Sequence, residues 1–348
     1  ALAHLDRKKI FITTKLHLQG KESKDEIKTR FKKCLERMKT DYADALYIHS
    51  VPTVKMTKYE PFHQAFEELK SEGKVRFRGV SNHGPRGKGE SMSKVLCAAA
   101  EDGRFDLMLV ALNFMNEEEG KKVIVACKKN NVGVTAMKTA PGILSAPNFD
   151  PENLTSDQQK YIERIMKRGK SRDTALKRLK RRLSGQQKTA DKSKPFIEKF
   201  GIKTKEQLQD KSIQWVISNP DVHTACISFS SFEMIDRIIP LSGTKLSAAD
   251  WKLLDEIKFA YNDQYCRHGC TACADDCPYS VPVSTIMRYA YYFEMQGNEK
   301  LAMEKYHRLG TLNASHCFTC DAPCLSSCPY GVNIPAQLAA AHSLLSLA

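Results

Sequence analysis

Eight of the twelve cysteines of this chain lie in two compact runs near its end. The runs read YCRHGCTACADDCPYSVP and HCFTCDAPCLSSCPYGVNIP, and a proline follows the last cysteine of each. Their cysteines are Cys266, Cys270, Cys273 and Cys277 in the first run, and Cys317, Cys320, Cys324 and Cys328 in the second. Thiolates are soft ligands that suit iron–sulfur clusters or zinc. Disulfides fit this spacing poorly, so the runs predict metal binding.

Runs that end in Cys-Pro resemble those of two-cluster bacterial ferredoxins, in which the fourth cysteine of each run ligates the other cluster. The resemblance implies two [4Fe–4S] clusters with exchanged ligands. The first cluster would take Cys266, Cys270, Cys273 and Cys328, and the second would take Cys317, Cys320, Cys324 and Cys277. Each run departs by one residue from the ferredoxin spacing. A single cluster or zinc is the alternative.

The stretch between the two runs, STIMRYAYYFEMQGNEKLAMEKYHRL, has the composition of a helical segment. We therefore expect residues 263–348 to form a small α-helical ferredoxin-type domain with two cysteine motifs. His268 and His316 stand beside ligand positions. A histidine there can tune a cluster's potential through a hydrogen bond, although simple exposure is the commoner reason for one.

The preceding 260 residues alternate short apolar runs with longer segments of helical period. The runs KIFITTK, DALYIHS, VRFRGVSN, FDLMLVALNF, VGVTAMK and HTACISF are rich in β-branched residues and predict six strands. Between the first two, Ile27, Phe31, Cys34, Leu35 and Met38 share one helical face. Alternating strands and helices predict a parallel sheet of the (β/α)8 TIM-barrel class. Because eight strands close such a barrel, we expect two further units upstream of residue 1.

The predicted domains are a barrel over 1–262, with an insertion over 141–205, and the cysteine domain over 263–348. Between Lys160 and Lys194 the insertion holds fourteen Lys and Arg against three acids, a charge of +11 in a chain of net +14. This charge predicts a salt-sensitive dock for a redox partner protein, with a solvated helix as the alternative. An RNA-binding arm is disfavoured, because no aromatic residues interleave with the charges. We expect no nucleic-acid partner.

The remaining cysteines, Cys34, Cys97, Cys127 and Cys226, lie in apolar patterns and are expected in the core. The sequence has no run of eighteen apolar residues, so no transmembrane segment is expected. No export signal opens the chain, which predicts a cytoplasmic protein. A twin-arginine signal upstream of residue 1 is the alternative.

The first 260 residues resemble the aldo-keto reductases, and the whole chain resembles the subgroup with a C-terminal iron–sulfur domain. IFITTK and DALYIHS match two strands of that family, with Lys15 and His49 at its catalytic lysine and histidine positions. The resemblance implies that Ser81, Asn82, Asn113 and Lys138 bind a nicotinamide cofactor, NADP(H). Asn113 is the nearest polar residue to Leu109, which occupies the position of the family's amide-binding glutamine.

The family's catalytic tyrosine and aspartate have no counterpart in the given sequence; in the family they come from the second strand unit, which we expect upstream of residue 1. The expected function is therefore an iron–sulfur oxidoreductase that couples carbonyl or alcohol chemistry to one-electron transfer with a partner protein. The alternative is a non-catalytic barrel that serves as the scaffold of an electron-transfer subunit in a larger redox complex.

The sequence shows no site for a redox group that would connect the hydride chemistry of the barrel with the one-electron chemistry of the cysteine domain. A hydride carries two electrons and a cluster passes one at a time, so the two need a splitter such as a flavin. HGPRGKGES follows a strand but fails the G-x-G-x-x-G spacing of a dinucleotide site. Its Arg86 and Lys88 are weak candidates for a phosphate contact, and a flexible surface loop is the commoner explanation.

Overall fold

The computed structural model describes residues 5–84, 89–141, 151–152, 154, 156–202, 205–229, 231–294 and 296–346. Its six strands form one sheet in chain order, and every neighbouring pair is parallel. They are β1 (Thr13–Leu16), β2 (Ala43–Ile48), β3 (Val75–Ser81), β4 (Leu107–Ala111), β5 (Gly133–Met137) and β6 (Thr224–Ala225). The six predicted strands and their parallel arrangement are thus confirmed.

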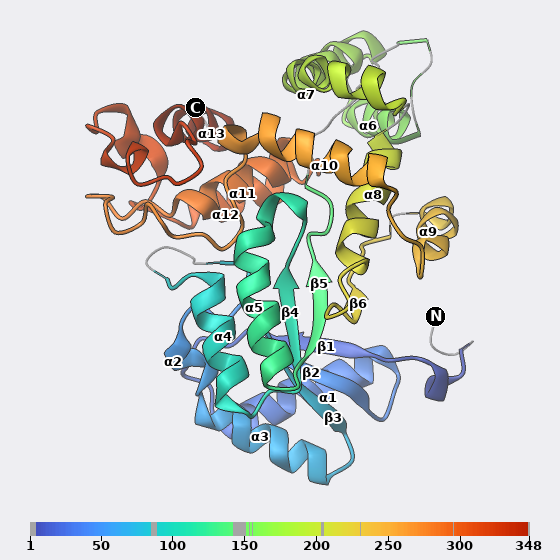
Figure 1. Cartoon of the computed structure of the whole chain (residues 1–348), viewed down its shortest axis with the longest axis vertical. Helices are drawn as coiled ribbons and strands as arrows, with labels where there is room; N and C mark the ends of the chain where they lie inside the picture. Colours follow the sequence, from blue (N-terminus) through green and yellow to red (C-terminus); the bar gives the residue numbers. More distant parts are fainter. Residues whose placement is uncertain are drawn as a thin grey trace.

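Helices connect the strands: α1 (Lys24–Met38), α2 (Val54–Thr57), α3 (Glu60–Ser71), α4 (Met92–Asp102), α5 (Glu117–Lys129) and α8 (Lys205–Ile217). The first begins at a capping box, in which Ser23 and Glu26 satisfy each other's backbone N–H groups. Its Ile27, Phe31 and Leu35 are buried in the sheet core, as the predicted helical face requires. Figure 1 shows β4 and β5 pointing toward a layer of later helices.

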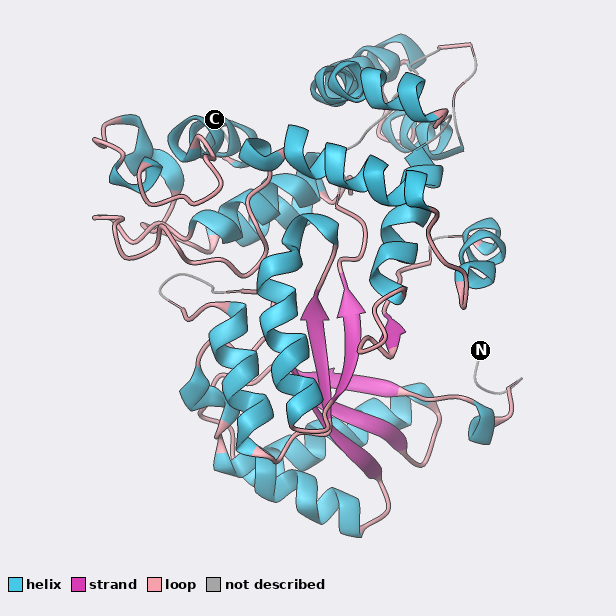
Figure 2. Ribbon diagram, viewed as in Figure 1, coloured by secondary structure: helices cyan, strands magenta, loops and turns pink. Residues whose placement is uncertain are grey.

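That layer contains α10 (Ala248–Ala260), α11 (Val283–Glu294), α12 (Glu299–His307) and α13 (Ile334–Leu345), after the short α9 (Phe232–Ile238). Short 3-10 helices lie between these elements, among them η3 (Phe114–Asn116), η5 (Asn262–Gln264), η6 (Ala314–Phe318) and η7 (Pro323–Leu325). From α10 onward the described residues form helices and loops without strands (Figure 2). The helical linker between the cysteine runs is confirmed as α11 and α12.

The C-terminal helices bury an apolar cluster of their own. Ile286, Tyr306, Leu338 and Ala341 lie at its centre, and cysteines from both runs pack against it. This cluster is separate from the core of the sheet. A boundary near residue 262 follows the end of α10 and stays a prediction.

The basic insertion contributes a helical hairpin of α6 (Ser156–Met166) and α7 (Arg172–Phe200). Leu179 and Leu183 are buried against Ile162 and Ile165, with Leu176 partly buried beside them. A narrow leucine stripe therefore joins the two helices, and the hairpin stands away from the sheet at the top of Figure 1.

The expectation of four core cysteines is correct for Cys127, which is buried, and partly so for Cys34 and Cys97, which pack half-buried against the core. It is wrong for Cys226, which is exposed. Cys226 directly follows β6, a strand of two residues that pairs with β5 at the edge of the described sheet. Within the described ranges, no helix is both long and apolar enough to cross a bilayer.

Candidate functional site

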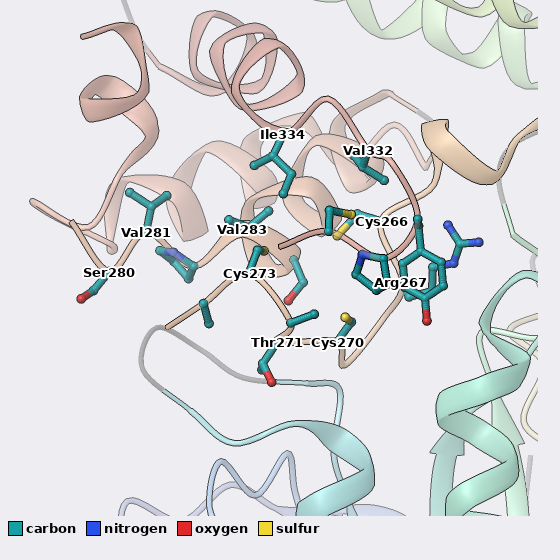
Figure 3. A pocket seen from close by; sticks show the side chains of 17 residues that line it. Cys266, Arg267, Cys270, Thr271, Cys273, Ser280, Val281, Val283, Val332 and Ile334 are labelled. Atoms are coloured by element: carbon teal, nitrogen blue, oxygen red, sulfur yellow. The ribbon is translucent and has the colours of Figure 1, made fainter. Parts of the chain in front are cut away.

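The eight cysteines of the two runs gather around two pockets. Cys266, Cys270 and Cys273 of the first run meet Cys328 of the second around a pocket of about 50 Å³, and we call these four the inner set. Figure 3 shows the three first-run side chains around this space, with Val281, Val283 and Ile334 near them.

Cys317, Cys320 and Cys324 of the second run meet Cys277 of the first around another pocket, of about 20 Å³. We call these four the outer set. Each set thus takes three cysteines from one run and one from the other. This is the grouping that exchanged cluster ligands require.

The spacing of the thiols bears on which metal species would fit. Among the described residues, no group of three or more His, Cys, Asp or Glu side chains is suited to a single metal ion. Four thiolates on one zinc ion would lie about 3.8 Å apart, because each Zn–S bond is ~2.3 Å. A cubane is a larger body with one thiolate on each iron, so its ligands lie farther apart. Thiolate donors suit either species, and the choice of a cubane stays a prediction.

The thiols lie in apolar surroundings. Burial raises the pKa of Cys266 and Cys270, and raises that of Cys273 to about 12. Burial likewise raises the pKa of Cys317 to about 11. Neighbouring cysteines add to each shift, because a second thiolate nearby disfavours the first. Such thiols keep their protons until a metal displaces them.

Arg267, between Cys266 and Cys270 of the inner set, connects the two runs. It is 1 % exposed, and its guanidinium lies 3.7 Å from the centre of the Tyr330 ring. It donates to the backbone oxygens of Asn262 and Tyr265, the latter at 2.7 Å, while Asn262 donates to the oxygen of Tyr330 at 3.2 Å. Since Tyr330 lies two residues after Cys328, this network holds Cys328 against the first run.

A backbone contact joins the inner set to the sheet. The N–H of Met92, at the start of α4, donates to the oxygen of Gly269 at 3.0 Å. Gly84, after β3, touches Gly269 so closely that a Cβ at Gly84 would overlap the Gly269 backbone. Both glycines have positive φ, +88° and +84°. The loop that carries Cys270 is therefore fixed on the β3–α4 connection.

A cavity of about 930 Å³ lies between the strand ends and the C-terminal helices. Lys15 and Lys138, at the ends of β1 and β5, line it from the sheet, together with His83 after β3. Cys266 of the inner set and His268 line it from the cysteine segment. The carboxyl ends of parallel strands are where barrel enzymes build their sites.

Of the predicted barrel residues, Lys138 has the most developed environment in this cavity. Its Nζ lies 3.4 Å from the hydroxyl of Tyr292, on α11, and 5.2 Å from the centre of that ring. Burial, aided by the charge of Arg288, lowers the pKa of Lys138 to about 8. Lys15 is more exposed.

Three other predicted residues are buried, and each has hydrogen bonds to backbone groups. Ser81 accepts from the N–H of Ser50 at 2.9 Å. Asn82 donates to the oxygen of Val51 and accepts from the N–H of Gly84. The amide of Asn113 donates to the oxygen of Lys138 at 2.9 Å and to the hydroxyl of Tyr265 at 3.4 Å, while its Oδ1 caps η3. These bonds shape the loops at the cavity's edge, and cofactor binding by these residues stays a prediction.

The histidines with described ring contacts near these sites lie in two places, at the strand ends and in the cysteine segment. The ring of His49 makes edge contacts with those of His17 and His83, at centroid distances of 6.2 and 5.8 Å. His268 makes an edge contact with Tyr265 inside the cavity, whereas His316 stacks on Tyr279. Arg86 and Lys88 lie outside the described residues.

Sequence reasoning missed the residues that α11 contributes to this site. Arg288 is 5 % exposed, lines the cavity and donates to the oxygen of His83. Tyr292, four residues further along the helix, reaches Lys138. An arginine and a tyrosine at helical spacing in an otherwise apolar segment were the available signal, but their partners lie more than 150 residues away.

The match to a family model concerns the sheet-forming part. The model of the aldo/keto reductase family matches residues 1–258. Over 133 residues the chain is 28 % identical to the methylglyoxal reductase DkgB of Escherichia coli O157:H7, covering 38 % of this chain and 47 % of that protein. Over 235 residues it is 23 % identical to the uncharacterized oxidoreductase YqkF of Bacillus subtilis, covering 67 % and 65 %. The chain thus spans about half the length of its first curated relatives.

Among solved structures, the holo form of the aldo-keto reductase AKR11C1 from Bacillus halodurans is 19 % identical, with a TM-score of 0.47. The match covers 72 % of this chain and 73 % of that one. The family match takes in all six strands and every helix up to the last turn of α10. The chain belongs to the aldo/keto reductase family.

Proposed function

We propose that this protein is an iron–sulfur oxidoreductase of aldo-keto reductase type. It couples the reduction of a small carbonyl compound, or the reverse oxidation of an alcohol, to one-electron transfer with a partner protein. One observation carries the proposal. The cavity at the strand ends is lined both by Lys15 and Lys138 and by Cys266 of the inner set.

The C-terminal part acts in this proposal as a ferredoxin-type domain over residues 263–348. The inner and outer sets would each hold one [4Fe–4S] cluster, which supplies one-electron transfer when bound. Three features support this assignment: the grouping of the thiols into two sets of four, their apolar surroundings, and the soft character of the ligands.

In the barrel, Lys15 and Lys138 would polarise the carbonyl oxygen of the substrate, because ammonium groups at a cavity wall stabilise developing negative charge. The ring of His49 contacts the rings of His17 and His83. With Lys15, His49 is the second proposed catalytic group. NADP(H) is the family's typical cofactor. Its proposed contacts here are Ser81, Asn82, Asn113 and Lys138.

The partner protein would dock near the outer set. Tyr279 lines the pocket of this set, and Phe318 and Leu325 directly follow Cys317 and Cys324 in the sequence. All three side chains are exposed, and exposed apolar side chains near a redox centre suit a transient interface. The basic segment 160–194 would add electrostatic steering, which high salt weakens.

The alternative function, a non-catalytic scaffold for electron transfer, is favoured by one observation. Ser81, Asn82 and Asn113 are buried and hydrogen-bonded to backbone groups, mostly those of neighbouring strand-end segments, which is a structural use of these side chains. A scaffold would contain both clusters and have no turnover with any carbonyl substrate.

The experiment begins with anaerobic purification and measurement of iron and acid-labile sulfide. About eight of each per chain are expected for two cubanes. Methylglyoxal, the compound after which the related DkgB reductases are named, is the first substrate to test. A reduced viologen dye serves as the one-electron donor, and the measurement is the loss of the carbonyl compound.

Turnover that disappears in Cys266→Ser and persists in Cys34→Ser supports the proposed enzyme, because Cys34 lies outside both sets. Full iron content without turnover supports the scaffold instead. Negligible iron and sulfide in anaerobically prepared protein contradicts both functions.

A further inference from the structure

The segments that carry the two cysteine runs differ in charge from the rest of the chain. Residues 268–287 and 309–348 contain no lysine or arginine, and they contain three acids, Asp275, Asp276 and Asp321. The whole chain carries a net charge of +14. All three aspartate side chains are exposed. This part of the surface is therefore negative in a protein that is otherwise strongly basic.

The structure brings the loops of these segments together. They lie between α10 and α11 and between α12 and α13, at the left edge of the molecule in Figure 1. The hydroxyl of Ser327 donates to the carboxylate of Asp276, which joins the loop of the second run to that of the first. Asp276 directly precedes Cys277, and Asp321 directly follows Cys320. Because both cysteines belong to the outer set, the negative charge gathers beside that set.

A stacked pair of rings lies in the same place. The ring of Tyr279 stacks on that of His316, with centroids 4.5 Å apart and an angle of 6° between the ring planes. Tyr279 lines the pocket of the outer set and is 42 % exposed, and His316 directly precedes Cys317. Each run thus contributes one ring. Aromatic side chains are enriched in the core of protein interfaces, and polar or charged side chains form the rim.

We propose that this surface docks a protein whose contact face is basic and which exchanges single electrons with the outer set. The inference rests on the proposed function and specifies the charge of the partner, which that function leaves open. Exposed rings and apolar side chains alone would fit many proteins. The aspartates beside them favour a basic face and disfavour an acidic one, because interfaces pair opposite charges.

Two other features would reinforce this selection. Cysteines bind a cluster as thiolates, so each loaded set would add negative charge to the same part of the surface. The basic segment 160–194 has the opposite charge, and it would repel a basic contact face. It would therefore steer the partner by turning that face away from the hairpin of α6 and α7 and toward the outer set.

The test uses the iron-loaded protein, reduced under anaerobic conditions, with cytochrome c as the probe. Cytochrome c is a small basic protein, and its ferric haem accepts one electron from a reduced cluster to give ferrous haem and an oxidised cluster. Stopped-flow absorbance measures the rate. The rate should fall as the ionic strength rises, because salt screens the attraction between opposite charges. Ferricyanide, a small anionic one-electron acceptor, should show the opposite dependence on salt.

Charge reversal at the proposed surface should affect the two acceptors in opposite directions. Asp275→Lys and Asp321→Lys should each slow the reduction of cytochrome c by about threefold to tenfold at low salt, and each should speed that of ferricyanide. Asp275→Glu keeps the charge and should keep the rate. Glu36→Lys is the matched control, because it makes the same change of charge at an exposed position on α1. It should leave both rates nearly unchanged.

Iron and acid-labile sulfide are measured on every variant. A variant that loses its clusters reduces both acceptors more slowly, which distinguishes that loss from an effect of charge. If fully loaded protein reduces cytochrome c at a rate independent of salt, or equally fast after Asp275→Lys and Asp321→Lys, the basic partner is refuted and the iron–sulfur proposal stands. Faster reduction of cytochrome c in these variants also refutes it. Negligible iron in the unaltered protein contradicts the proposed function and, with it, this inference.

Discussion

The inner and outer sets have the same number of cysteines and the same exchanged composition, but they have different neighbours. The inner set touches the sheet-forming part through Gly269 and opens onto the large cavity through Cys266. The outer set has the exposed Tyr279 in the lining of its pocket, and the exposed Phe318 and Leu325 directly follow two of its cysteines in the sequence. Position, rather than ligand type, therefore distinguishes the two.

This difference assigns a direction to electron flow under the proposed function. The inner set is placed to exchange electrons with an occupant of the cavity, and the outer set with a partner at the surface. Exchanged ligands strengthen the link, since Cys277 and Cys328 each connect one run to the other set.

The largest expected effect tests the exchange itself. Cys328→Ser should remove the inner cluster although Cys328 belongs to the second run, and Cys277→Ser should remove the outer one. Each variant should lose about half of its iron, because each cubane holds four of the eight atoms. Iron analysis and electron paramagnetic resonance of the reduced protein provide the measurement. Identical residual spectra in the two variants would contradict the exchange.

The next effect concerns the junction of the inner set with the sheet. In Gly269→Ala the new Cβ would overlap the Cβ of Met92, and the residue must also keep a φ of +84°. We expect the free energy of unfolding to fall by about 3 kcal/mol or more, from strain and overpacking together.

Gly310→Ala is the matched control, because Gly310 also has a positive φ, +57°, but open space around it. Strain alone should cost about 1–2 kcal/mol there. Chemical denaturation of both variants provides the comparison. Equal losses would mean that the contact with Met92 is unimportant.

Arg267→Lys should release Cys328 from the first run. Lysine cannot reproduce a planar stack on Tyr330 together with several directed hydrogen bonds. A loss on the order of 2 kcal/mol is expected, with iron depleted from the inner set before the outer one. Iron analysis and thermal unfolding are compared with Arg308→Lys, an exposed control in the same segment. Depletion of the outer cluster first would contradict this role.

Much of this arrangement was predictable from the sequence. Alternating apolar runs predicted the six strands, whereas the cluster ligands implied by the ferredoxin-like Cys-Pro endings stay a prediction. Cys226 was misplaced because periodicity does not reveal that a strand lies at a sheet edge. The contacts of Arg288 and Lys138 with distant residues depend on how the helical layer covers the strand ends, and no local pattern encodes that placement. The hydrogen bonds that Asn82 and Asn113 make with backbone groups could likewise not be predicted from the sequence.

A smaller effect links the cavity to pH. Lys138 has its pKa lowered from 10.5 to about 8, so the side chain is cationic below that pH and increasingly neutral above it. Binding of NADPH, whose phosphates are anionic, should therefore weaken as the pH rises through about 8, by up to about tenfold per pH unit for a single required proton. Fluorescence titrations across this range measure the change. Lys138→Arg should remove the dependence, because arginine stays protonated. A profile that is the same in both proteins would assign the titration to another group.

The smallest effect compares two free cysteines. Cys226 is exposed and lines the cavity, so a maleimide should label it readily in the native protein. Cys127 should resist labelling, because it is buried and its pKa is raised to about 12. Mass spectrometry of peptides identifies the labelled site. Added NADPH should slow the reaction at Cys226, and an unchanged rate would argue against an occupant on that side of the cavity.

The stack of Arg267 on Tyr330 has a consequence for how this protein would tolerate oxidative damage. Many small metal domains unfold when their metal leaves, because metal binding supplies their folding energy. Here the stack of Arg267 on Tyr330 and the hydrogen bond from Asn262 to Tyr330 hold the two cysteine loops together without a metal. If oxygen destroyed a cluster, the two cysteine loops would stay together, and a new cluster could be inserted without refolding of this part of the chain.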